Sequence, residues 1–274
     1  MNFSYGVMQG RLSTKIENKI QAFPEKYWKT EFSKAKAIGL KSIEWTLDYK
    51  NFAENPILTK KGQFQIKQLA KKYSIKINSI TGDCFMQNPF WKKKNNQKLL
   101  NDLIKIIQSC KKLGIKFIVI PLVDNGSIVN KNDENKLIKS CKYVSKHIKN
   151  SNVRLIFESD FSPQRLRKFI KKFDKKYFGI NYDVGNSAGL GYKIDDEFRF
   201  YGKYIYNVHI KDRFKYGKTV RLGQGNANFL KLFQNLKKIK YSRELILQTA
   251  RSKNNRHLEE IKINLKYLKK FHNA

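Results

Sequence analysis

The chain has 274 residues, of which 41% are hydrophobic, and this is enough to build one large core. We therefore expect a single domain over residues 1–274. No run of 18 apolar residues occurs, and the first nine residues lack the basic and apolar parts of a signal peptide, so we expect no membrane association and a cytoplasmic location. Three cysteines without a CxxC pair predict neither a disulfide framework nor a cysteine zinc site.

The formal net charge is +35, from 57 lysines and arginines against 22 acidic residues. A strongly basic surface can bind phosphate backbones, which raises nucleic acid as a partner. Only ten of the 57 basic residues are arginines, and the lysines are spread over nearly every predicted helix in a chain also rich in Asn and Ile. An AT-rich genome produces this bias without a partner, so we favour biased composition over nucleic-acid binding.

Short apolar runs alternate along the chain with longer segments of helical period, which is typical of repeated βα units and a parallel sheet. The absence of a glycine-rich turn after the first strand argues against a doubly wound dinucleotide-binding sheet. Eight units favour closure, so we predict an α/β fold of the (β/α)₈ TIM-barrel class. The predicted strands are 5–9, 42–46, 77–82, 117–123, 154–159, 179–184, 205–211 and 244–250.

The segments between these strands have amphipathic patterns. We expect the first helix to open at Pro24 and to bury Trp28, Phe32 and Ala35, and the third to end at Gly114. Lys, Asn and Glu fill most other helical positions, as expected for an outer ring of helices. Later helices repeat apolar residues at i, i+3 or i+4, and i+7: Leu100, Leu103, Ile104 and Ile107; Leu137, Cys141, Val144 and Ile148; Leu258, Ile261, Leu265 and Leu268.

In such a barrel, the polar residues that end the strands converge on one open face, where the chemistry takes place. Carboxylates and one imidazole on adjacent strands suit a divalent metal ion, with Mn²⁺, Mg²⁺ or Co²⁺ preferred and Zn²⁺ as a further option. The strand-end residues are Gln9, Arg11, Glu44, Asp83, Asp124, Glu158, Asp183, Asn186, His209, Lys211, Asp212, Gln248 and Arg251.

Three of these residues are the strongest metal candidates. Glu158 follows an apolar run, and its burial would require a cation, either a metal or an ion-pair partner. Asp183 could equally cap a turn before Gly185. Of the four histidines, His209 alone lies on a predicted strand; a lone strand histidine is usually structural, but its place after Glu158 and Asp183 favours a ligand.

Four segments carry a family resemblance: IFESD (156–160), YDVGN (182–186), VHIKD (208–212) and LGQGNANF (222–229). They resemble the strand-end motifs of the xylose-isomerase-like superfamily of sugar phosphate isomerases and epimerases, which includes an abasic-site (AP) endonuclease branch. The opening MQGRLS, with residues 23–45, resembles the sugar phosphate isomerase/epimerase branch. The resemblance covers nearly the whole chain. It implies metal ligation by Glu158, Asp183 and His209 and, where the family has a last carboxylate, by Gln248.

The resemblance also implies isomerase activity in carbohydrate metabolism, by proton transfer through a metal-stabilised enediolate. Glu158 is then the catalytic base, and Lys211 is a candidate second proton carrier. The catalytic position of Gln248 departs from the family pattern, because an amide cannot exchange a proton near neutral pH. We therefore expect one-base aldose–ketose isomerisation to fit this chain better than two-base epimerisation.

Further polar residues are candidates for holding the substrate, a small sugar or sugar phosphate: Gln9, Arg11, Asn186, Arg213 and Arg251. Each arginine could bind a phosphate or simply lie on the surface. The aromatic segment 88–91 could form a lid over the sugar or pack in the core. Two other functions stay open: a degenerate barrel that binds a sugar without turnover, and an abasic-site endonuclease, which would need more strand-end histidines. A homodimer is a further option, because relatives are often dimeric.

Overall fold

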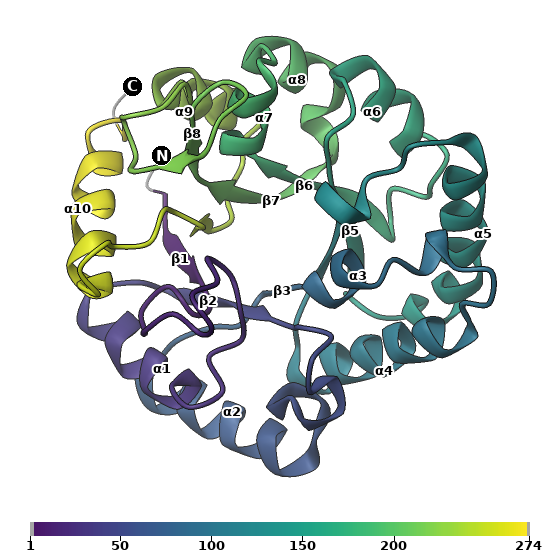
Figure 1. Cartoon of the computed structure of the whole chain (residues 1–274), viewed down its shortest axis with the longest axis horizontal. Coiled ribbons are helices and arrows are strands. Elements are labelled where there is room, and N and C mark those ends of the chain that lie inside the picture. Colours follow the sequence, from purple (N-terminus) through teal and green to yellow (C-terminus); the bar gives the residue numbers. More distant parts are fainter. Residues whose placement is uncertain (1–2, 273–274) are drawn as a thin grey trace.

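The computed structural model describes residues 3–272, and it shows eight parallel strands closed into a barrel inside a ring of helices (Figure 1). Around the barrel the strand order is β1, β10, β7, β6, β5, β4, β3, β2, with β2 returning to β1. This confirms the predicted TIM barrel. The barrel strands are β1 (Tyr5–Met8), β2 (Ser42–Thr46), β3 (Ser79–Thr81), β4 (Phe117–Leu122), β5 (Arg154–Ser159), β6 (Phe178–Asp183), β7 (Ile205–Ile210) and β10 (Leu245–Leu247).

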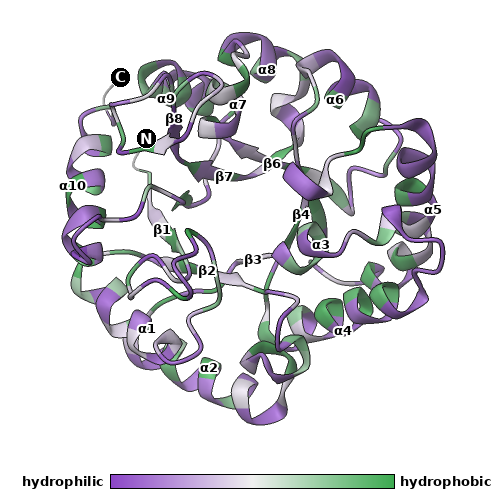
Figure 2. Ribbon diagram, in the orientation of Figure 1, coloured by the Kyte–Doolittle hydropathy of each residue, from purple (hydrophilic) through white to green (hydrophobic). Residues whose placement is uncertain are grey.

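Most of the helices follow the strands in sequence and cover the outside of the barrel. Hydrophobic and hydrophilic residues alternate along the turns of α4 and α5, as expected for helices with one buried face (Figure 2). The helices are α1 (Trp28–Ala37), α2 (Lys60–Tyr73), α3 (Asp83–Gln87), α4 (Gln97–Leu113), α5 (Lys131–Ile148), α6 (Pro163–Ile170), α7 (Val184–Leu190), α8 (Ile194–Tyr201), α9 (Phe229–Lys238) and α10 (His257–Lys269).

Most of the predicted helical core residues are buried. Trp28, Phe32 and Ala35 are buried on α1, and all four predicted positions of α5 are buried. On α4 and α10 the outermost predicted residues, Ile104 and Leu258, are only partly buried but still pack against the core. The amphipathic period therefore identified the correct face of each helix.

The sequence misplaced some boundaries. Helix α1 begins at Trp28 and not at Pro24, because the Pro24 carbonyl accepts hydrogen bonds from the amides of Tyr27 and Trp28 and closes a turn first. Strands β3 and β10 are shorter than predicted, so Gln248 lies just beyond a strand end. The segment between β7 and α9 adds a small antiparallel hairpin, β8 (Asp212–Arg213) with β9 (Thr219–Val220).

The aromatic segment that follows β3 packs in the core and does not form a lid. Phe90 and Trp91 are fully buried, and the Trp91 indole donates a hydrogen bond to the Gly126 carbonyl at 3.1 Å. Phe90 also makes an edge contact with Phe85. Within residues 3–272, no helix is both long enough and apolar enough to cross a membrane.

Candidate metal centre

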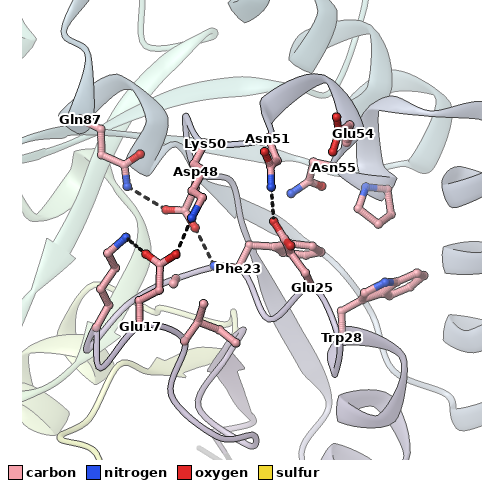
Figure 3. Close-up of a pocket in the computed structure, with 14 residues that line it drawn as sticks. Glu17, Phe23, Glu25, Trp28, Asp48, Lys50, Asn51, Glu54, Asn55 and Gln87 are labelled. Carbon is pink, nitrogen blue, oxygen red and sulfur yellow. Dashed lines mark hydrogen bonds and ion pairs between the residues drawn. The ribbon is translucent and has the colours of Figure 1, made fainter.

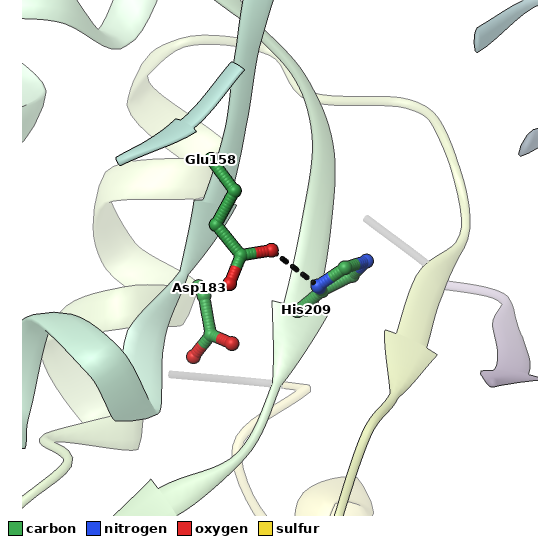
Figure 4. Close-up of side chains that lie close together, drawn as sticks. All are labelled: Glu158, Asp183 and His209. Carbon is green, nitrogen blue, oxygen red and sulfur yellow. Dashed lines mark ion pairs between the residues drawn. The ribbon is translucent and has the colours of Figure 1, made fainter. Parts of the chain in front are cut away.

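Three side chains from neighbouring strands meet inside the barrel, near the carboxyl ends of the strands. Glu158 on β5, Asp183 on β6 and His209 on β7 each offer one ligand atom, and these atoms lie within 4.8 Å of one another. Figure 4 shows the three groups side by side, with the Glu158 Oε2 atom 3.1 Å from His209 Nδ1. All three residues are buried. The structure thus assembles the two carboxylates and one imidazole that the sequence predicted would lie together.

Strand register explains this meeting. Asp183 and His209 are paired neighbours in the parallel sheet, so their side chains leave the same face at the same height. Asp183 also ends β6 and caps α7, since its Oδ1 atom accepts a hydrogen bond from the Asn186 amide at 2.8 Å. Asp183 therefore caps a turn with one oxygen and belongs to the cluster as well, so the two roles that the sequence left open are compatible.

A layer of buried polar side chains lies beneath this cluster. The Nε2 atom of His209 is 2.7 Å from Glu44 Oε1, across the barrel on β2. The other Glu44 oxygen accepts hydrogen bonds from Ser79 at 2.5 Å and Asn207 at 2.7 Å. Asn181 donates to Glu158 Oε2 at 2.7 Å, and its Nδ2 atom lies 3.0 Å from His209 Nδ1. This layer fixes the orientation of both the imidazole and the Glu158 carboxylate.

The hydrogen bonds indicate which imidazole nitrogen faces the cluster. Nε2 is held by Glu44 at 2.7 Å, whereas Nδ1 lies 3.1 Å from Glu158 Oε2, so Nδ1 is the nitrogen turned towards the other candidate ligands. Burial alone would lower the pKa of His209, but the nearby carboxylates of Glu44 and Glu158 raise it to about 10. Three buried carboxylates, Glu44, Glu158 and Asp183, thus face one histidine and Lys211. This surplus of negative charge, with oxygen and imidazole donors, fits a divalent cation.

Gln248, the candidate fourth ligand predicted from the sequence, is linked to the cluster by Lys211. The Lys211 ammonium lies 2.7 Å from Asp183 Oδ2 and donates to Gln248 Oε1 at 3.1 Å. The lysine therefore stands between the amide and the carboxylate. Lys211 directly follows β7 and Gln248 directly follows β10, although the sequence predicted that Gln248 lies within its strand.

Asn186 and Arg213 extend the centre towards solvent. Asn186 Nδ2 donates to Glu158 Oε1 at 2.7 Å, and Asn186 Oδ1 accepts from Arg213 at 3.0 Å. Arg213 also donates to the Gly217 carbonyl inside the hairpin. Asn186 therefore holds one oxygen of Glu158, and Arg213 holds Asn186; a role of either residue in substrate binding stays a prediction.

The other predicted substrate-binding residues follow β1 and β10 and are tied to backbone groups. Arg11 is buried and donates to the carbonyls of Thr249 at 3.0 Å and Ile20 at 2.6 Å, so it is not a surface arginine. Arg251 donates to the carbonyls of Gly10 and Ser13. Gln9 is fully buried and accepts from the Thr46 amide at 3.0 Å. These contacts join the β1 and β10 loops; a role in substrate binding stays a prediction.

The glycine-rich segment 222–229 folds around Asp212. This fully buried carboxylate accepts three backbone hydrogen bonds of 2.9–3.0 Å, from Gly223, Gly225 and Ala227. A Cβ atom on Gly225 would lie 2.2 Å from Asp212 Oδ1. The motif is thus an anchored loop next to the site, and its glycine allows the backbone to approach the carboxylate.

Sequence reasoning missed the supporting roles of Glu44, Asn181 and Asn207. A signal was present, because Asn181 and Asn207 each lie two residues before a candidate ligand, on the same face of an otherwise apolar strand. Glu44 likewise interrupts the apolar strand SIEWT. Polar residues repeated with a period of two on buried strands indicate a polar barrel interior.

A separate cavity of about 300 Å³ lies between the β1 loop and the loop after β2 (Figure 3). Two of its acidic side chains, Glu17 and Asp48, already have partners. Glu17 pairs with Lys19 and Lys50, and Asp48 accepts from the Phe23 amide and from Gln87. We therefore assign the chemistry to the barrel mouth and not to this cavity.

Comparisons with known proteins agree with this geometry. The chain is 26% identical over 256 residues, 85% of its length and 87% of the relative's, to the Haemophilus influenzae protein named "Putative L-ribulose-5-phosphate 3-epimerase SgbU". The structure resembles that of D-psicose 3-epimerase with D-tagatose from Clostridium cellulolyticum H10, with a TM-score of 0.75, 15% identity and coverage of 98% and 99% of the two chains. It also resembles the IolI protein with a bound zinc atom, with a TM-score of 0.74, 15% identity and 98% coverage of each chain.

A family model described as xylose isomerase-like TIM barrel matches residues 32–271. This match spans all barrel strands except β1, and it includes the three clustered side chains. The chain belongs to the xylose isomerase-like TIM barrel family.

Proposed function

We propose that this protein is a divalent-metal-dependent isomerase or epimerase of a small sugar or sugar phosphate. The observation that carries the proposal is the buried cluster of Glu158, Asp183 and His209 at the carboxyl ends of three adjacent strands. The epimerase names of the Haemophilus relative and of the Clostridium structure support the substrate class.

Glu158, Asp183 and His209 would hold the metal, with the amide oxygen of Gln248 as a candidate fourth donor. When bound, a divalent ion polarises a carbonyl group and stabilises the negative charge that develops on its oxygen. Asn181 and Asn186 each donate to one oxygen of Glu158, so its carboxylate is held in one orientation. In this orientation Glu158 acts as the base that removes the proton next to the carbonyl, a role that typically contributes about 10²–10⁴-fold.

Binding without turnover is the second candidate, and the Lys211 contact favours it. The ammonium group contacts both Asp183 and Gln248, and it adds positive charge where the family has a carboxylate. An endonuclease role has less support, because the other three histidines lie away from the cluster, on α5, on α10 and just after α10.

The test is metal content followed by turnover. Elemental mass spectrometry of the purified protein should find about one divalent metal ion per chain, and His209→Ala should lose it, whereas His147→Ala on α5 should not. With metal bound, the protein should convert L-ribulose 5-phosphate or a ketose such as D-tagatose, and Glu158→Gln should abolish conversion. A wild-type protein that takes up metal but converts no sugar would favour the binding role. A wild-type protein that takes up no metal, even after addition of Mn²⁺ or Co²⁺, would refute the proposal.

A further inference from the structure

Asp83 presents a buried carboxylate oxygen without a partner in the barrel mouth. The residue follows β3 directly and is only 5% exposed. Its Oδ1 atom accepts a hydrogen bond from Thr81 at 2.9 Å, but no donor in residues 3–272 has hydrogen-bonding geometry to Oδ2. No cationic group of the same residues forms an ion pair with it within 4.0 Å. A buried, unsatisfied carboxylate is costly, and such groups concentrate at functional sites.

The register of the strands places this carboxylate over the barrel interior. Glu44 faces the interior, since it contacts His209 across the barrel. Thr46 lies two residues later on the same face of β2, and Thr81 pairs with it on β3. The Thr81 hydroxyl therefore points inward and holds Asp83 there. Helix α3, which Asp83 begins, lies inside the ring of outer helices (Figure 1).

Around the closed barrel, β3 and β7 are four strands apart in either direction. Asp83 thus lies opposite the wall that carries His209 and Lys211, and a substrate bound at the metal centre would lie between them. Lys211 is the rival proton carrier, but its ammonium group is already held by two oxygens, on Asp183 and Gln248. Asp83 Oδ2, in contrast, has neither a hydrogen-bond donor nor an ion-pair partner among the described residues.

We propose that Asp83 is the second acid–base residue of this site, exchanging a proton with substrate oxygens while Glu158 transfers the proton on carbon. The inference rests on the proposed function. Burial and the negative charge of Asp48 raise the pKa of Asp83 to about 7, and the Thr81 hydrogen bond and the nearby Gln21 amide oppose the rise. A carboxyl group with a pKa near neutrality can both give and take a proton at working pH.

The steps balance for an aldose–ketose isomerisation. Glu158 takes the proton from the carbon beside the carbonyl, the C–H electron pair forms a C=C bond, and the C=O electron pair moves onto the carbonyl oxygen. In a separate, later step protonated Asp83 gives its proton to that oxygen. The product of this half-reaction is an enediol. Asp83 then takes the proton of the neighbouring hydroxyl, and Glu158 returns its proton to the former carbonyl carbon. The carbonyl and hydroxyl groups have exchanged places, and both carboxyl groups are restored.

The two roles can be separated in deuterium oxide, with metal-loaded protein and L-ribulose 5-phosphate or D-tagatose. Mass spectrometry measures deuterium uptake at carbon, and chromatography measures product. Glu158→Gln should lose both. Asp83→Asn should keep carbon exchange within about fivefold but lose product formation by about 100-fold or more. The matched control is Asp174→Asn, an exposed carboxylate between α6 and β6, which should change neither rate.

A milder variant guards against a folding defect. Thr81→Val leaves the Asp83 carboxyl group in place without its hydrogen bond, and product formation should fall by about tenfold, less than in Asp83→Asn. The inference is overturned if Asp83→Asn forms product at the wild-type rate, or if it loses both activities to the same extent. If the wild-type protein itself shows neither exchange nor product, the proposed function fails and the role of Asp83 fails with it.

Discussion

The Nε2 atom of His209 lies 2.7 Å from Glu44 Oε1, although the two residues are 165 positions apart in the chain. Both side chains are fully buried. A carboxylate that accepts from the second ring nitrogen fixes the tautomer and the ring plane of a ligating histidine, and it raises the basicity of the first nitrogen. Glu44 is therefore a positioning residue of the proposed metal centre.

Replacement of Glu44 by Gln should weaken metal binding by about tenfold, and replacement by Ala by up to about 100-fold. Gln keeps the shape and can still accept the hydrogen bond, but it lacks the charge. A competition titration with a chromophoric chelator and Co²⁺ or Zn²⁺ measures the affinity. The exposed Glu259 on α10 provides the control, because its replacement by Gln should leave affinity unchanged. Unchanged affinity in both Glu44 variants would contradict the positioning role.

Replacement of Gln248 by Glu should increase metal affinity by about tenfold, because an added ligand charge strengthens binding to a divalent ion. The new carboxylate would also pair with Lys211, which now contacts the amide oxygen, and this competition limits the gain. The same chelator titration measures the change, with Gln97→Glu at the exposed start of α4 as control. A Gln248→Glu protein that binds metal no better than wild type would show that this position is not a ligand.

Asp83→Asn should make the metal-free protein more stable at pH 8 than wild type. The pKa of Asp83 is raised from 3.8 to about 7 in the folded state. An acid with a raised folded-state pKa contributes stability at low pH that is lost as pH rises through these two values. The neutral Asn avoids this loss, which at about 1.4 kcal/mol per pH unit amounts to at most roughly 4 kcal/mol.

Urea unfolding of both proteins at pH 4 and pH 8 tests this expectation, since the gain should be present at pH 8 and nearly absent at pH 4. The charged groups that influence Asp83 are Asp48 and Glu158, which disfavour its ionisation, and Arg11, which favours it. A gain of the same size at both pH values would mean that removal of the charge is not its cause.

Asp212→Ala should destabilise the fold by about 3 kcal/mol, because three amides of the glycine-rich loop lose a fully buried, charged acceptor. Gly225→Ala should have a comparable effect from the other side of the contact, since its Cβ would overlap the same carboxylate. Urea unfolding measures both. The exposed Asp196, paired with Arg199 on α8, is the control, and its replacement by Ala should cost less than about 1 kcal/mol. Near-wild-type stability of Asp212→Ala would show that the loop does not depend on this anchor.

The sequence by itself determined the βα alternation and thus the barrel, because hydrophobic period is a local property of each segment. It also identified Glu158, Asp183 and His209 as polar ends of adjacent strands, because parallel strands in a barrel end on one face. Segment ends were less accurate: Pro24 precedes a turn and not a helix, and β10 stops before Gln248.

Contacts across the barrel were decided only by the tertiary structure. Strand pattern assigns a side chain to a face, but barrel closure sets which residues of distant strands meet, as Glu44 on β2 meets His209 on β7. Burial of Arg11 against backbone carbonyls and of Phe90 in the core depends on how loops cross the strand ends, which no local period encodes. For the same reason, the sequence alone does not show that Asp83 Oδ2 lacks a hydrogen-bond donor, because this depends on the positions of all neighbouring groups.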